Sequence, residues 1–283
     1  MLEAMLLGLI QGLSEFIPIS STAHLTIAAS LLGVIDPRQP ERWTAFMAVV
    51  QLGTLGAVLA YFRRDIVQSA RAFVAENVTS RTAFATQSAD ARMGWFVILG
   101  SVPIVVIGLT GKDFIESAVT KDLRVIAASL IGLAAVLWWV DRRAAFRRTT
   151  ATMTLRDAVL IGFAQAVALI PGSSRSGTTM TAALALGFTR ESAARFSFLL
   201  SIPAILGAGV IEFLHELDHI QWTEGGIELA LATLTAAVSG YWSIAFLLDF
   251  LRRRTMTSFV VYRIVLGLLL ALLLSMGILT PLP

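Results

Sequence analysis

Two short segments hold most of the polar side chains that lie within apolar parts of the chain. The first reads QGLSEFIPISSTAH, from Gln11 to His24, and the second reads QAVALIPGSSRS, from Gln165 to Ser176. Both contain Ile-Pro-x-Ser-Ser, so Pro18 aligns with Pro171, whereas the two Gln residues align only after a slip of one residue. Hydroxyls, a carboxylate, an imidazole and a guanidinium are costly inside a bilayer, so their presence predicts a functional site.

Arg175 is the sharpest indication of the chemistry. An arginine near the bilayer centre costs roughly 2.5–3.5 kcal/mol on insertion scales, so it needs an anion. A Gly/Ser loop that leads into a helix N-terminus suits a phosphate, and a guanidinium adds bidentate hydrogen bonds. A structural ion pair between Arg175 and Glu15 is the alternative, and both roles are possible if the pair opens for a substrate. The predicted supporting donors are Ser173, Ser174, Ser176 and Thr178.

The first segment carries residues for acid–base or nucleophilic chemistry. Gln11 and Glu15 are four residues apart and share one face of a helix. His24 follows Ser21 by one helical turn, a spacing that permits nucleophilic or general-base chemistry. Ser, Thr and His also join membrane helices, so a structural role is the competing interpretation. The further candidate phosphate ligands in this segment are Gln11, Ser20 and Thr22.

The composition indicates an all-α membrane protein that crosses the bilayer several times. The 283 residues are 56% hydrophobic and 14% charged, with a mean hydropathy of +0.77. Soluble domains are about 25% charged. The chain has no Cys, which excludes disulfides, thiolate catalysis and iron–sulfur clusters. Its arginines lie between apolar runs, which indicates membrane topology rather than nucleic-acid binding. No organic cofactor is expected, because no dinucleotide or phosphate-loop motif is present.

The elements that must position these residues are six spans and two broken apolar stretches. A span needs about 20 apolar residues. The stretches from about Leu2 to Leu32 and from Ala158 to Leu186 are interrupted at Pro18 and Pro171. Each is predicted to form a re-entrant helix–loop–helix hairpin. The six predicted spans are Trp43 to Phe62, Met93 to Leu109, Leu123 to Val140, Phe196 to Leu214, Ile227 to Phe250 and Phe259 to Leu279.

The order of elements, one broken stretch and three spans, occurs twice. Three crossings are an odd number, so the second unit must begin on the opposite face of the membrane. The chain is therefore predicted to be a single membrane domain of two inverted-topology repeats, about residues 1–142 and 152–283, whose breaks meet near the midplane.

Loop charges predict the orientation. Arginines gather in four segments, near Arg63, Arg142, Arg190 and Arg252, which the positive-inside rule places in the cytoplasm. Both termini then face outward. So do an acidic loop at Glu216 and Asp218 and a loop containing Lys112 and Lys121, the last being the weakest point of this topology.

The motifs GLSEFIPISSTAH and LIPGSSRSG resemble the two signature motifs of undecaprenyl-diphosphate phosphatases, the bacitracin-resistance family of the bacterial inner membrane. Supporting matches are Val50–Gly53, Arg195–Pro203 and Tyr262–Ile264, so the resemblance spans nearly the whole chain. Many members carry Glu where this chain has Gln11, which makes Glu15 the essential carboxylate here.

The resemblance implies a function. Such an enzyme hydrolyses undecaprenyl diphosphate to undecaprenyl phosphate and inorganic phosphate at the outer face of the inner membrane. It thereby recycles the lipid carrier for peptidoglycan synthesis and confers bacitracin resistance. The implied partners are this substrate and the lipid bilayer, and Mg²⁺ or Ca²⁺ is associated with activity. No feature of the sequence specifies an oligomeric state.

Roles for the residues follow as hypotheses. Arg175 binds the diphosphate, and Ser21 or a water is the nucleophile. His24 is the general base or the acid for the leaving group. Glu15 orients His24 or holds a divalent ion. The alternatives from other classes are a secondary transporter or lipid flippase, which also uses inverted repeats, and an intramembrane serine protease, which Arg175 in a Ser-rich loop disfavours.

Overall fold

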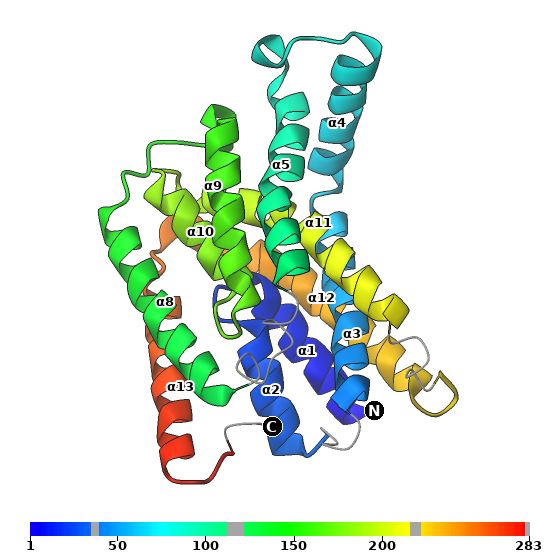
Figure 1. Ribbon diagram of the computed structural model, residues 1–283, viewed down its shortest axis with the longest axis vertical. Coiled ribbons are helices and arrows are strands. Elements are labelled where there is room, and N and C mark those ends of the chain that lie inside the picture. Colours follow the sequence, from blue (N-terminus) through cyan, green and yellow to red (C-terminus); the bar gives the residue numbers. More distant parts are fainter. Residues whose placement is uncertain (35–39, 112–121, 216–221, 281–283) are drawn as a thin grey trace.

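The computed structural model describes residues 1–34, 40–111, 122–215 and 222–280, and these ranges form helices without a β-strand (Figure 1). The elements in chain order are α1 (Leu2–Phe16), α2 (Ser21–Leu32), α3 (Pro40–Tyr61), α4 (Arg63–Val74), η1 (Ala75–Thr79), η2 (Phe84–Thr86), α5 (Ala89–Thr110), α8 (Leu123–Arg143), η3 (Thr150–Thr152), α9 (Leu155–Ala166), η4 (Val167–Leu169), α10 (Arg175–Ala185), α11 (Arg190–His215), α12 (Trp222–Arg253) and α13 (Thr257–Ser275).

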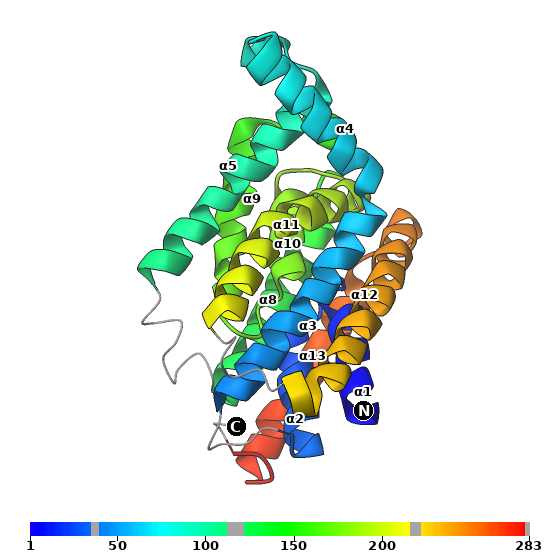
Figure 2. The same cartoon turned by 90° about the vertical axis from the view of Figure 1, so that its right-hand side faces the viewer.

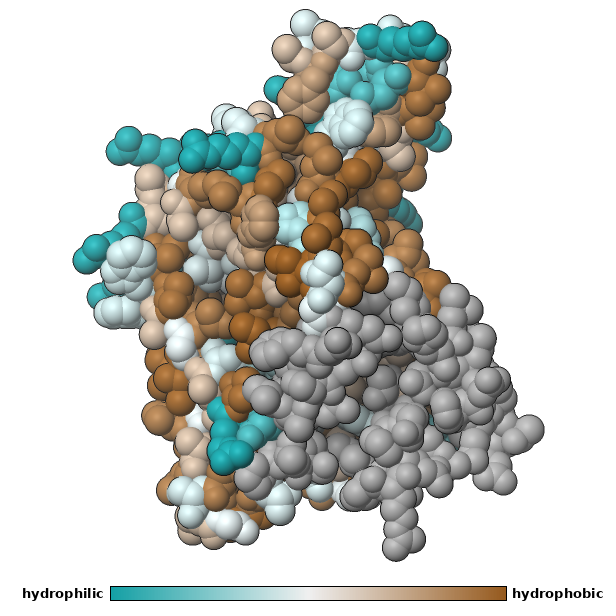
Figure 3. All heavy atoms as spheres, viewed as in Figure 1, coloured by the Kyte–Doolittle hydropathy of each residue, from teal (hydrophilic) through white to brown (hydrophobic). Residues whose placement is uncertain are grey.

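A helix coincides with each of the six predicted spans. Over the described residues, four helices are long and apolar enough to cross a membrane, namely α5, α8, α12 from Gly226, and α13. A fifth span results if the bent pair of α3 and α4 is counted as one, although the two helices meet at 75°. The protein is thus an all-helical, multi-pass membrane protein. Hydrophobic residues cover much of the middle of the face drawn in Figure 3.

Both predicted breaks are present. Helix α1 ends at Phe16, and Ile17 is extended (φ −67°, ψ 137°) because it precedes a proline. The second break follows η4, with Ile170 extended (φ −81°, ψ 121°). Helices α1 and α9 enter from opposite ends of the molecule, and the turns after them meet in its middle (Figure 1). We call the segment α1–α2 the first hairpin and α9–η4–α10 the second hairpin.

Glycines allow the first helix of each hairpin to pack tightly against a long helix. A Cβ added to Gly8 of α1 would lie 2.2 Å from the carbonyl oxygen of Ala232 in α12. A Cβ added to Gly162 of α9 would lie 2.1 Å from the carbonyl oxygen of Gly100 in α5. Small residues are the usual way for membrane helices to approach backbone to backbone. These two contacts fix how deeply each hairpin enters the molecule.

Ion pairs join the arginine-rich segments at one end of the molecule. Arg190 at the start of α11 pairs with Asp141 near the end of α8, at 2.6 Å. Glu191 pairs with Arg252 of α12, at 2.7 Å. The N-terminus and the end of α13 lie at the other end, and α4 with the start of α5 projects beyond the arginine-rich end (Figures 1 and 2). The loops containing Lys112, Lys121, Glu216 and Asp218 lie outside the described residues.

Candidate active site

Glu15 is the centre of a hydrogen-bonded cluster that joins the two hairpins. Its Oε2 accepts hydrogen bonds from Gln11 Nε2 at 3.0 Å and from Ser21 Oγ at 2.7 Å. Its Oε1 forms an ion pair with the guanidinium of Arg175 from the second hairpin. The side chains of Glu15 and Arg175 are 5% and 14% exposed. The structure therefore brings together four predicted site residues from positions far apart in the sequence.

A cavity of about 170 Å³ lies beside this cluster. Ile104 of α5 and Ala204 of α11 contribute to its wall, so long helices close it around the hairpin tips. Gln51 of α3 adds a polar group to the lining, and as a polar residue within an apolar span it is also a candidate from the sequence for supporting the site. The predicted site residues that line the cavity are Glu15, Ser20, Ser21, Thr22, Ser174 and Arg175.

Two helices begin at this cavity with the same unusual cap. Ser20 caps α2 and Ser174 caps α10, with φ values of 76° and 67°. Each hydroxyl accepts a hydrogen bond from a backbone N–H of its own helix, from Ala23 at 3.4 Å and from Gly177 at 3.2 Å. Left-handed backbone at residues other than glycine is strained and concentrates at functional sites. The positive ends of two helix dipoles therefore converge where an anion would be bound.

The caps correct the alignment of the two hairpins. The shared Ile-Pro-x-Ser-Ser pattern pairs Ser20 with Ser173, but the cap geometry pairs Ser20 with Ser174. The same spacing pairs Gly8 with Gly162 and Gln11 with Gln165, so the one-residue slip needed for the Gln residues is the true register. Helix packing and capping set this correspondence. In this register Pro18 corresponds to Gly172, one residue after Pro171.

In the corrected register the hairpins carry complementary chemistry. Glu15 corresponds to Leu169, and Ser21 corresponds to Arg175. The first hairpin thus supplies the carboxylate and hydroxyl, and the second supplies the cation. Gln165 is fully buried, and its amide has no hydrogen-bond partner among the described residues. Gln165 lacks the partner that Gln11 has, because Leu169 occupies the position that corresponds to Glu15.

His24 is held away from Ser21. Its Nδ1 lies 2.7 Å from the carbonyl oxygen of Ser20, and its Nε2 lies 2.5 Å from the hydroxyl of Tyr262 in α13. The Tyr262 ring also stacks on the imidazole, with centroids 5.5 Å apart. Glu15, rather than His24, is therefore the hydrogen-bond acceptor of the Ser21 hydroxyl. Tyr262 is a site residue that the sequence marks only as part of a supporting motif.

The other predicted phosphate donors lie behind the cavity wall. Ser173 is fully buried, and its hydroxyl has no partner in the described parts of the chain. Ser176 donates to the carbonyl oxygen of Ile17 at 3.3 Å, which connects the two tips. Thr178 donates to the carbonyl oxygen of Arg175 at 3.0 Å. None of these three residues lines the cavity, and the hydroxyls of Ser176 and Thr178 stabilise the second tip instead.

The residues at the cavity can hold a divalent cation only together with a ligand. No group of three or more His, Asp or Glu side chains gathers anywhere in the described residues. Among the described residues that line the cavity, Glu15 is the one carboxylate. Mg²⁺ is commonly bound by one or two carboxylates together with substrate phosphates. A cation therefore fits between Glu15 and a bound diphosphate.

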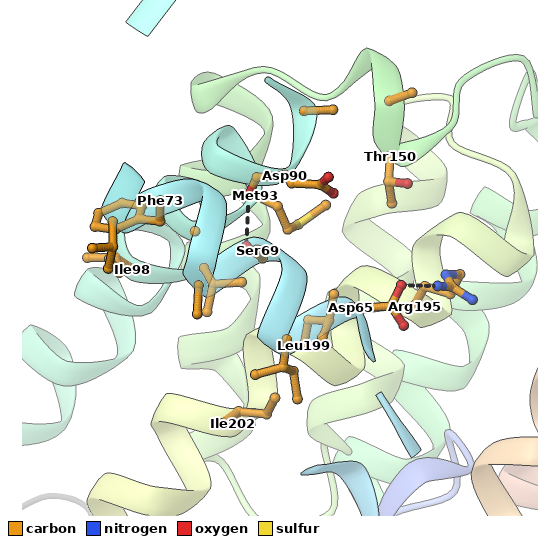
Figure 4. Close-up of a pocket in the computed structure, with 17 residues that line it drawn as sticks. Asp65, Ser69, Phe73, Asp90, Met93, Ile98, Thr150, Arg195, Leu199 and Ile202 are labelled. Atoms are coloured by element: carbon orange, nitrogen blue, oxygen red, sulfur yellow. Dashed lines mark hydrogen bonds and ion pairs between the residues drawn. The ribbon is translucent and has the colours of Figure 1, made fainter. Parts of the chain in front are cut away.

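A larger cavity, of about 470 Å³, lies between α4, α5 and α11 toward the arginine-rich end (Figure 4). Its lining is mainly apolar, with residues such as Phe73, Met93 and Leu199, and it includes an ion pair between Asp65 and Arg195 at 2.9 Å. It contains no residue of either motif. The smaller cavity is therefore the candidate active site, because the reactive groups line it.

Comparison with known proteins gives consistent results over nearly the full length. A family profile described as "Bacitracin resistance protein BacA" matches residues 4–269. A protein of Syntrophobacter fumaroxidans is 53% identical over 94% of this chain and 94% of its own length. A protein of Myxococcus xanthus is 52% identical over 99% of this chain and 91% of its own length. A protein of Chlorobium phaeovibrioides is 48% identical over 99% of this chain and 99% of its own length. All three relatives are named undecaprenyl-diphosphatase.

Proposed function

The chain belongs to the bacitracin resistance protein BacA family, and we propose that the cavity between its two hairpin tips is where it hydrolyses undecaprenyl diphosphate. The products are undecaprenyl phosphate and inorganic phosphate. The observation that carries this assignment is the cluster of Glu15, Ser21 and Arg175 at two converging helix N-termini. This arrangement combines a nucleophile, a base and an anion-binding site around one cavity.

Substrate binding opens the ion pair between Glu15 and Arg175. The diphosphate takes the place of the Glu15 carboxylate on the guanidinium, which forms bidentate, charge-assisted bonds with phosphate oxygens. The N-termini of α2 and α10 add backbone donors. Arg175 then stabilises the charge that develops on the phosphoryl group during transfer. Release of Arg175 also leaves the Glu15 carboxylate free to act as a base.

The reaction proceeds through Ser21. Its Oγ attacks the terminal phosphorus while its proton passes to Glu15, which already accepts this hydrogen bond. The bond between that phosphorus and the bridging oxygen breaks, and undecaprenyl phosphate leaves. We assign His24 as the acid that donates a proton to this leaving group. Water then attacks the phosphoserine and gives its proton to His24. The Ser21–phosphate bond breaks as Ser21 Oγ takes back its proton from Glu15, which releases inorganic phosphate and regenerates the hydroxyl.

A divalent cation, Mg²⁺ or Ca²⁺, would be held by Glu15 and the diphosphate oxygens. When bound, it neutralises negative charge on the transferring phosphoryl group. Turnover is therefore expected to fall when a chelator is added and to recover when either ion is restored.

We also propose that the molecule is built from two inverted repeats, with the cavity facing the outside of the inner membrane. The opposite entry of α1 and α9 supports this arrangement, as does the matching pair of close contacts at Gly8 and Gly162. The ion-paired, arginine-rich end is then cytoplasmic. Both termini and the active site face the periplasm, where the lipid diphosphate is hydrolysed.

Phosphate release from undecaprenyl diphosphate by purified protein tests the proposed function. Arg175→Ala is expected to lower kcat by about a hundredfold or more, as loss of a transition-state donor does. Size-exclusion chromatography in detergent checks that the variant is folded. Normal release by folded Arg175→Ala contradicts the assignment of Arg175. Movement of substrate without phosphate release by the wild type would favour a transporter instead.

A further inference from the structure

Arg263 of α13 is a buried cation without a carboxylate partner among the ion pairs of the described residues. Its side chain is 1% exposed and is the largest fully buried side chain of the described chain. A buried charge is costly unless it is hydrogen-bonded. The two terminal nitrogens of Arg263 have partners, whereas its Nε has none among the described residues. The partners of this guanidinium therefore indicate why α13 carries it.

Arg263 has four hydrogen-bond acceptors among the described residues, and three of them lie in the two breaks. Its Nη1 donates to the carbonyl oxygen of Pro18 in the first tip, at 3.4 Å. Its Nη2 donates to the carbonyl oxygens of Gly172, at 3.2 Å, and Ser173, at 3.0 Å, in the second tip. The fourth acceptor is the carbonyl oxygen of Ser129 in α8, at 3.4 Å. One planar group thus bridges both tips.

The chemistry of the breaks explains the need for such a group. Backbone carbonyls that leave a helix inside a membrane protein must find donors within the protein. The carbonyl oxygens of Pro18, Gly172 and Ser173, in the turns before α2 and α10, accept hydrogen bonds from Arg263. Arg263 is not part of the cavity lining, and its guanidinium supplies several donors at fixed angles. Gly177 leaves room for the guanidinium, because a Cβ there would lie 2.7 Å from Nη1 of Arg263.

We propose that Arg263 is a positioning residue for the phosphatase site, which sets the separation of the two hairpin tips so that Ser21 and Arg175 reach the same phosphate. This inference rests on the proposed function. The reacting groups come from different tips, so a change in tip separation moves the nucleophile relative to the phosphate clamp. A misplacement of 1 Å can lower a rate about a hundredfold.

The first test compares wild type, Arg263→Lys and Arg263→Met in phosphate release. Lys keeps the charge, but its compact ammonium cannot bridge carbonyls of both tips. We expect kcat per folded molecule to fall at least tenfold in both variants. Val265→Ala, at a lipid-exposed position of the same helix, serves as the control and should retain normal kcat. A lower yield or unfolding midpoint with unchanged kcat and KM would show a merely structural role and overturn the proposal.

A second measurement does not depend on activity. The chain has no Cys, so spin labels can be placed at Leu13→Cys and Val167→Cys, exposed positions close to the two tips. Pulsed electron–electron distance measurement should give a distribution that widens or shifts when Arg263→Lys or Arg263→Met is added. An unchanged distribution in the folded double-labelled Arg263→Lys protein would overturn the proposal. If the wild type released no phosphate, the proposed function would fail, while the distance measurement would still decide whether Arg263 sets the tip separation.

Discussion

Glu15 has more partners than one carboxylate can keep during a reaction. It accepts hydrogen bonds from Gln11 and Ser21 and pairs with Arg175, so the proposed phosphate ligand Arg175 is already bound to a carboxylate of the same chain. The types and spacing of these residues allow the sequence to predict this pairing. The pairing of His24 with Tyr262 could not be predicted from the sequence. The two residues are 238 positions apart, and nothing in the sequence around either one indicates that they are in contact.

Ser21→Ala tests the nucleophile at this scale. The substitution removes the attacking oxygen and one hydrogen bond to Glu15, so we expect phosphate release to fall by at least a hundredfold while substrate still binds. Intact-protein mass spectrometry of quenched wild type should detect a phosphorylated species that Ser21→Ala lacks. Substantial turnover by Ser21→Ala would instead make water the nucleophile, with Glu15 as its base.

The hairpins show what a repeated pattern can and cannot predict about elements. Pro18 and Pro171 correctly predict where the two helices break, because proline removes a backbone donor and disfavours helical backbone in the residue before it. They mispredict the register by one residue, because the structural match is set by the caps Ser20 and Ser174 and by close helix packing. In the sequence, the correct register is carried by separated pairs such as Gly8 with Gly162 and Gln11 with Gln165, and these do not outweigh the compact Ile-Pro-x-Ser-Ser pattern.

The close contact at Gly162 gives a prediction for this scale. Gly162→Ala places a Cβ within 2.1 Å of a backbone oxygen of α5, so α9 must move away. Overpacking of this kind typically costs about 1–3 kcal/mol. We expect a lower midpoint of thermal unfolding in detergent. Gly132→Ala in α8 is the matched control, because a Cβ there meets no atom within 4 Å, and it should leave the midpoint unchanged or slightly raised.

At the scale of the whole molecule, composition and periodicity predicted a helical membrane protein, and the structure confirms that class. Four or five helices in the described residues meet the length and apolarity of a span, fewer than the six predicted. The difference arises at α3 and α11. Helix α3 counts only together with α4, into which it bends sharply, and α11 is not among the helices that are long and apolar enough to cross a membrane. Orientation in the membrane remains a prediction from the arginine-rich end.

Cysteine labelling tests that orientation. Ser80→Cys lies in the exposed segment after η1 at the arginine-rich end, and Ser275→Cys lies at the exposed end of α13. We expect a membrane-impermeant maleimide to label Ser275→Cys in cells whose outer membrane alone is permeabilised. Ser80→Cys should react only after the inner membrane is opened. The reverse pattern would place the cavity on the cytoplasmic side.

The most direct test of the mechanism is to measure binding and turnover separately for Glu15→Gln. A non-hydrolysable methylene analogue of a prenyl diphosphate, added with a chelator, should bind this variant at least as tightly as wild type, because the anion that competes for Arg175 is gone. Release of phosphate from undecaprenyl diphosphate should nevertheless fall by at least a hundredfold. Arg175→Gln should lose both binding and turnover. Weaker analogue binding by folded Glu15→Gln, or turnover near the wild-type rate, would contradict the mechanism.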